Sequence, residues 1–149
     1  MTVRVVLDTN VVLDCFVFRD PGIASLHASM LDGTATAITN ASCFEELERV
    51  LAYGQLDLAP EERPAVLAAY RASSTFYDGP ASMERLPSCR DHDDQKFLEL
   101  ARDANADLLV TKDKALLELA VKRVGIRGFR IITPRMFTRI RSVDKLGAI

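Results

Sequence analysis

The chain has 149 residues, a length that suits one globular domain able to bury a core without disulfide or metal staples. Its hydrophobic fraction of 48% and charged fraction of 27% exclude a disordered or low-complexity protein. No apolar run is long enough to cross a bilayer and no basic start leads into a secretory core, so we expect a cytoplasmic protein.

The net charge of −2 conceals an uneven distribution along the chain. Residues 122–145 contain eight basic side chains and one acidic one, which leaves eleven basic and twenty acidic residues elsewhere. An acidic body is able to bind metal while a basic end binds a polyanion. A solvated surface, or a basic patch that faces an acidic partner, explains the same pattern equally well from charge alone.

The cysteines and histidines form no recognisable ligand pattern. Three cysteines are an odd number and include no CxxC pair, so a disulfide framework is not expected. Cys15 and Cys43 fall on apolar patterns, where cysteine behaves as a small hydrophobe. The two histidines lack the spacing of zinc ligands, and His27 lies on the apolar stripe of a predicted helix.

Strands and helices alternate along the first half of the chain. A β-branched run at 3–7 predicts a buried strand, and Asp8-Thr9-Asn10 behind it suits the start of a helix. Apolar residues at helical spacing over 23–31, followed by a glycine, predict a second helix. A short strand is expected at 34–39. Ser42-Cys43-Phe44-Glu45 then matches a capping box, which predicts that the next helix begins at Ser42.

The same alternation continues in the second half of the chain. We expect one short strand within the segment 73–90, whose glycine and prolines make it hard to interpret. The other expected elements are a helix at 60–72, a helix from Asp91 to about Asn105, a strand at 108–110, a helix at 116–124 closed by Gly125, a strand at 129–132, and a helix opened by Thr133-Pro134.

This order of elements predicts the fold class. Strands joined through helices by short connections form a mainly parallel sheet covered by helices on both faces. We therefore expect an α/β protein, a three-layer α/β/α sandwich with a central sheet of about five strands. No repeat or linker interrupts residues 1–149, so one domain is the simplest interpretation.

Four acidic residues are placed to meet at one edge of that sheet. Ligands of an open parallel sheet bind beyond the carboxyl ends of its strands, and Asp8 and Asp113 follow the first and fourth predicted strands. Glu46 and Asp94 lie in the early turns of two helices. Each acid also has a structural explanation, because a helix start attracts negative charge, and Asp91 is a good N-cap.

The hydrolysis of a phosphodiester explains why such acids would gather. The reaction needs an activated water in line with the leaving oxygen, and two metal ions about 4 Å apart supply both the activation and the charge stabilisation. Magnesium prefers oxygen ligands and keeps several waters, so three or four carboxylates suffice. Without a cation such a cluster repels itself and raises its own pKa values.

Four segments of the chain resemble, in order, the motifs of the PIN-domain family. They are VLDTNV at 6–11, EELERVL at 45–51, DHDDQKFLELA at 91–101 and ADLLVTKD at 106–113. The resemblance covers nearly the whole chain and is closest to PIN proteins described as toxins of toxin–antitoxin pairs. It implies a three-layer fold, dependence on Mg²⁺ or Mn²⁺, and cleavage of single-stranded RNA that leaves a 3′-hydroxyl and a 5′-phosphate.

The resemblance also implies roles for individual residues. The catalytic, metal-binding acids are Asp8, Glu46, Asp94 and Asp113. Asp94 is preferred to Asp93 because it lies seven residues before Ala101, as in the family's third motif. The supporting polar residues are Thr9, Asn10, Thr111 and, as a candidate for the outer shell of the metal, Asp91. Candidate contacts to the RNA backbone are Lys112, Lys114, Arg130 and Arg135.

Partners follow from the same resemblance. It implies a single-stranded RNA substrate, a small antitoxin that covers the acidic crevice, and a homodimer, with no membrane involved. A metal-binding PIN scaffold or an RNA-processing factor without a toxin role fits the same residues. A haloacid-dehalogenase-like phosphatase also has an aspartate after its first strand, but it needs a second aspartate where this chain has Asn10.

Overall fold

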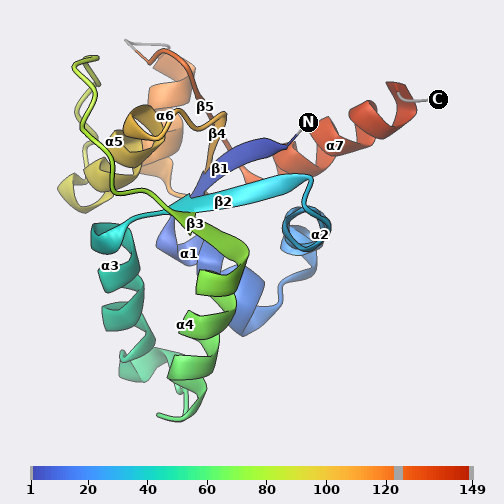
Figure 1. Ribbon diagram of the computed structural model, residues 1–149, viewed down its shortest axis with the longest axis vertical. Helices are drawn as coiled ribbons and strands as arrows, with labels where there is room; N and C mark the ends of the chain where they lie inside the picture. Colours follow the sequence, from blue (N-terminus) through green and yellow to red (C-terminus); the bar gives the residue numbers. More distant parts are fainter. Residues whose placement is uncertain (1, 123–125, 148–149) are drawn as a thin grey trace.

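The computed structural model describes residues 2–122 and 126–147, which contain a sheet of five parallel strands in the order β3-β2-β1-β4-β5 (Figure 1). The strands are β1 Val3–Leu7, β2 Ala35–Thr39, β3 Ser74–Phe76, β4 Leu108–Val110 and β5 Arg130–Ile132. The predicted parallel sheet is confirmed, including the short strand expected within 73–90.

In these described residues, seven α-helices connect and cover the strands. They are α1 Thr9–Leu13, α2 Ala24–Asp32, α3 Ala41–Leu51, α4 Glu62–Ser73, α5 Gln95–Asp103, α6 Lys114–Lys122 and α7 Pro134–Gly147. A π-helical turn at Asp14–Phe18 extends α1, and 3₁₀ turns occur at Pro21–Ile23, Gly54–Leu56 and His92–Asp94. Within the described part of the chain, none of these helices has the length and apolarity that a membrane crossing requires.

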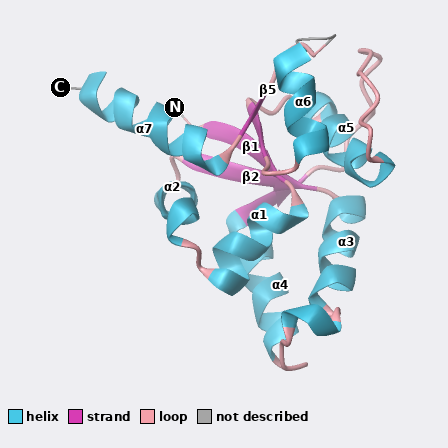
Figure 2. Cartoon of the chain, turned by 180° about the vertical axis from the view of Figure 1, so that it is seen from behind, coloured by secondary structure: helices cyan, strands magenta, loops and turns pink. Residues whose placement is uncertain are grey.

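The helices lie on both faces of the sheet, as the three-layer prediction requires. Val5 and Leu7 point to one face and pack with residues of α1, α2, α3 and α7. Val6 points to the other face and packs with residues of α5 and α6, so alternate residues of β1 enter separate cores. Figure 2 shows α1 to α4 on one side of the strands and α5 and α6 on the other.

The strand order fixes where a ligand site forms. From β1 the chain builds one half of the sheet outward through β2 and β3, and then returns to add β4 and β5 on the other side of β1. The order therefore reverses between β1 and β4, and the crevice beyond their carboxyl ends is the usual ligand position. The backbone N–H of Asp8 donates to the carbonyl of Val110 at 3.2 Å, which ties the two strand ends together.

The start of α3 differs from the prediction. The helix begins at Ala41, and its N-cap is Asn40, whose Oδ1 accepts a hydrogen bond from the Cys43 backbone N–H at 2.9 Å. The capping box expected at Ser42 is therefore wrong, and Ser42 and Glu45 are exposed. The physical reason is that Asn40 is the first residue after β2 and has the extended backbone that a cap needs, so the helix starts without a connecting loop.

Other helix boundaries agree more closely with the sequence. Thr133 caps α7 by accepting from the Met136 backbone N–H at 3.1 Å, and Pro134 takes the first helical position. The helix predicted from 116 begins earlier, at Lys114, because Asp113 caps it. Its predicted closure at Gly125 lies outside the described residues.

Replacing Asn40 tests the observed cap directly. Asn40→Ala should lower the free energy of unfolding by about 1 kcal/mol, because the Cys43 N–H loses its acceptor. Ser42→Ala is the matched control and should change it by less than about 0.5 kcal/mol. Urea denaturation followed by circular dichroism measures both variants. A larger loss for Ser42→Ala would restore the capping box.

Candidate metal centre

Asp8 joins the two central strands through its side chain. Its Oδ1 accepts from the Val11 backbone N–H at 2.9 Å and so caps α1, while Oδ2 accepts from the hydroxyl of Thr111 just beyond β4. The residue is 3% exposed. Burial raises the pKa of Asp8 to about 6, against the opposing effect of these two hydrogen bonds, and the nearby carboxyl of Asp113 raises it further.

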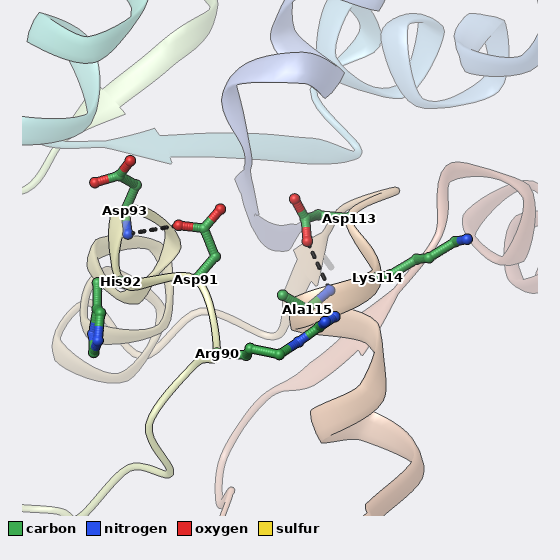
Figure 3. Close-up of a pocket in the computed structure, with 7 residues that line it drawn as sticks. All are labelled: Arg90, Asp91, His92, Asp93, Asp113, Lys114 and Ala115. Carbon is green, nitrogen blue, oxygen red and sulfur yellow. Dashed lines mark hydrogen bonds between the residues drawn. The ribbon is translucent and has the colours of Figure 1, made fainter.

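Three more carboxyls come together close to the hydrogen bond between Asp8 and Thr111. Asp91, Asp94 and Asp113 each present an oxygen, and the three oxygens lie within 4.8 Å of one another. Asp113 reaches the cluster from the turn after β4, where its Oδ1 also accepts from the Ala115 N–H at 2.7 Å. Asp91 and Asp113 line a pocket of about 730 Å³. Figure 3 shows their carboxyls facing each other from different loops.

Asp94 gives the clearest reason to expect a cation at this site. Its burial, followed by the charges of Asp113 and Asp91, raises the pKa of Asp94 to about 7, and a side-chain hydrogen bond with Asp113 and the charge of Asp8 act in the same direction. Its Oδ2 is buried and has no hydrogen-bond partner among the residues that the structure describes. Such an oxygen is costly to leave unsatisfied, and a divalent cation among hard carboxylate ligands would satisfy it. The residues present therefore fit a bound Mg²⁺ or Mn²⁺.

Glu46, expected from the resemblance as the fourth acid, stands apart from this group of three. One carboxylate oxygen, Oε1, lies 2.6 Å from the ammonium nitrogen of Lys96. The other, Oε2, accepts from the hydroxyl of Thr9, the residue next to Asp8. The side chains of Lys96 and Glu46 are 21% and 18% exposed, so this ion pair is largely shielded from water.

The predicted supporting residues lie in different surroundings. Thr111 donates to Asp8 and accepts from the Asp113 backbone N–H at 3.0 Å, so one hydroxyl positions two acidic residues. Asp91, expected only in the outer shell, lies within the carboxylate cluster and also caps the 3₁₀ turn by accepting from the Asp93 N–H at 3.0 Å. Asn10 is exposed in the first turn of α1.

The four candidate RNA contacts do not share one surface. Lys114 lines the acidic pocket. Lys112 pairs with Asp14, a hydrogen bond that raises the pKa of the lysine, and it lines a neighbouring pocket of about 180 Å³ together with Arg135. Arg130 begins β5, so it lies toward the amino ends of the strands, away from the edge that carries the acids.

Sequence reasoning missed two polar contributors to this site. Lys96 was not considered, although a lysine inside the acid-rich segment 91–101 was a visible signal of a charge partner. Asp14 was not considered either, and it is a buried acid that fixes Lys112. Its position one helical turn beyond Asn10 was the available signal, since that places it on the side of the helix near the strand ends.

Without metal, the protein should lose stability as the pH rises from about 4 to 7. Folded Asp8 keeps its proton up to about pH 6 while the unfolded chain releases it near 3.8, so the folded state binds more protons and stability falls with rising pH. That pKa difference corresponds to about 3 kcal/mol. Urea denaturation in EDTA measures the slope, and Asp8→Asn should make it shallower, with the remaining slope due to Asp94, whose pKa is also raised. Equal slopes for the two proteins would contradict the assigned cause.

Comparison with known proteins agrees with this geometry. The family model described as PIN domain matches residues 4–115, three quarters of the chain, from β1 to the start of α6. That segment contains every carboxyl of the cluster together with Asp8 and Glu46. No curated protein matches the chain. The match over most of its length shows that the chain belongs to the PIN domain family, whose members are typically metal-dependent nucleases.

Proposed function

We propose that the protein is an endoribonuclease that cleaves single-stranded RNA with Mg²⁺ or Mn²⁺. The observation that supports it best is the buried Oδ2 of Asp94, which lacks a hydrogen-bond partner among the described residues and belongs to a residue of the three-carboxyl cluster. A structural role alone does not account for that oxygen. Asp94 is the N-cap residue of α5, but its side chain makes no capping hydrogen bond, unlike those of Asp91 and Asp113.

Asp94 and Asp113 would hold the ion, and Asp91 belongs to the same cluster. Asp8 would add negative charge close to them, held in place through Thr111. When bound, a divalent ion supplies a nucleophile at neutral pH and stabilises charge that develops on the phosphate. The role of Thr111 is to fix the carboxylate of Asp8 and the backbone of Asp113 through one hydroxyl. Because Asp8 is held by two donors, its carboxylate is oriented before substrate arrives.

Basic residues near the pocket suit the RNA backbone. Lys114 and Arg90 line the same pocket as Asp91 and Asp113. Arg135 lies in the first turn of α7, where the helix dipole disfavours a cation, so a role in helix stability does not explain it. Contacts of this kind give affinity without choice of sequence, which leaves the RNA target open.

In the cell we propose a toxin role, with a small antitoxin that covers the acidic pocket, and a homodimer in the cytoplasm. These finer assignments rest on the resemblance of the four motifs to PIN toxins. An RNA-processing PIN enzyme without a toxin role is the second candidate, because it would use the same carboxyls. Metal binding without turnover on any single-stranded RNA would favour a non-enzymatic scaffold instead.

Asp8→Asn should lower metal-dependent RNA cleavage by about 100-fold or more, because it removes charge from the centre and keeps the shape and the cap of α1. The measurement is single-turnover cleavage of a labelled single-stranded RNA with Mn²⁺, with EDTA as the negative control. An RNA duplex and a single-stranded DNA of the same sequence test the substrate class. Cleavage by the variant at the original rate would show that the assigned centre is wrong.

Arg135→Ala should weaken RNA binding to a similar extent for unrelated sequences and lower the slope of log affinity against log salt by about 1. Fluorescence anisotropy over a KCl series measures this, in the Asp8→Asn background so that the RNA stays intact. Arg130→Ala, at the other end of the strands, should have the smaller effect. The reverse order of effects would move the RNA path to the opposite edge of the sheet.

A further inference from the structure

Lys96 lies in an unfavourable place for an isolated lysine. It belongs to the first turn of α5, where the helix dipole disfavours positive charge, and it follows Asp94 by two residues. Its side chain is 21% exposed, whereas lysines in folded proteins are mostly solvated. A specific interaction must compensate for both costs, and the structure shows it as the contact of 2.6 Å with Glu46.

Both carboxylate oxygens of Glu46 already have a partner within the protein. Oε1 pairs with Lys96, and Oε2 accepts from the Thr9 hydroxyl. Asp94 is the opposite case, because its buried Oδ2 has no partner in the described part of the chain. The acidic site therefore has two unequal halves, one already neutralised by a protein cation and one that still lacks a positive charge.

We propose that the ammonium of Lys96 takes the place of a second metal ion. By neutralising Glu46 it leaves the site with room for one divalent cation, at the cluster of Asp91, Asp94 and Asp113. Lys96 is thus a positioning residue that acts through Glu46. A second divalent ion at Glu46 would have to displace the ammonium or approach it closely, and like charges repel strongly where water is largely excluded. The inference rests on the proposed metal centre.

A purely structural role for the same ion pair makes a different prediction. The pair joins α3 to α5, so its loss lowers stability in either case. Only the proposed role also changes the number of metal ions that the folded protein binds. Metal stoichiometry, rather than activity or melting temperature, is therefore the measurement that separates the two roles.

The test is a titration with Mn²⁺ alone, in which the number of bound ions is measured. Isothermal titration calorimetry and the electron paramagnetic resonance signal of free Mn²⁺ both report that number. The wild-type chain should bind one ion. Lys96→Met keeps a stem of similar length beside Phe97, removes the charge, and should bind two. Lys96→Arg restores a cation and should bind one. Adding Glu46→Gln to Lys96→Met should return the count from two to one.

Lys114→Met controls for net charge. It removes the same charge from an exposed lysine that lines the acidic pocket, but it leaves no carboxylate without its ion-pair partner among the described residues. Its count should stay at one. Two ions for Lys114→Met would show that lower positive charge alone recruits the second ion, and would overturn the inference.

Other outcomes are equally decisive. One ion for a folded Lys96→Met, or two for the wild type, overturns the role of Lys96 and leaves the metal centre standing. No ion for the wild type removes the metal centre and the proposed function with it. If Lys96→Met does not fold, Lys96→Gln, which also removes the charge, takes its place and should bind two ions; one ion for the folded Lys96→Gln overturns the inference.

Discussion

The hydrogen bond from Thr111 to Asp8 joins the carboxyl ends of β1 and β4, and the acidic centre is built around that joint. It fixes Asp8 at the point where the strand order reverses, and the same hydroxyl accepts from the backbone of Asp113. A parallel sheet brings the ends of all its strands to one edge, so acids that are distant in sequence become neighbours there. The ionised forms of Asp8 and Asp94 are nevertheless destabilised there, because burial and neighbouring carboxyls raise the pKa values of both residues.

The crowding of carboxyls at this edge of the sheet is a stronger argument for a cation site than the sequence motifs are. Caps and hydrogen bonds account for Asp8, Asp91 and Asp113 individually, as ordinary features of helix starts. They do not account for the placement of Asp91, Asp94 and Asp113 with carboxylate oxygens within 4.8 Å of one another, since charge repulsion opposes that arrangement. A fold that concentrates negative charge in this way is stabilised by a cation, and a metal ion that stabilises the fold is also placed to act on a phosphate.

The sequence was sufficient to predict the sheet, because β1, β4 and β5 are short runs rich in branched apolar residues, and the acids that follow β1 and β4 are easily located. β3 was expected only as some short strand within 73–90, since three residues carry little periodicity. The start of α3 was misplaced because the capping box at Ser42 matches a local pattern, whereas the actual cap at Asn40 depends on where β2 ends. The direction of Glu46 toward Lys96 was beyond prediction for a similar reason, since it depends on how α3 and α5 pack against the same strand ends.

The packing of α3 against α5 makes the two parts of the acidic site differ in charge, because it pairs Glu46 with Lys96. α3 brings Glu46 to the strand ends paired with Lys96 of α5. The buried Oδ2 of Asp94, two residues before that lysine, has no hydrogen-bond partner among the described residues. One short segment therefore contains both Lys96, whose ammonium pairs with Glu46, and Asp94, whose buried Oδ2 has no such partner in the described part of the chain. Because the two lie on consecutive turns, the 3₁₀ turn and the start of α5, their spacing is set by the backbone. A change in that turn would therefore move Asp94 and Lys96 together. It would alter both the carboxylate cluster and the ion pair with Glu46.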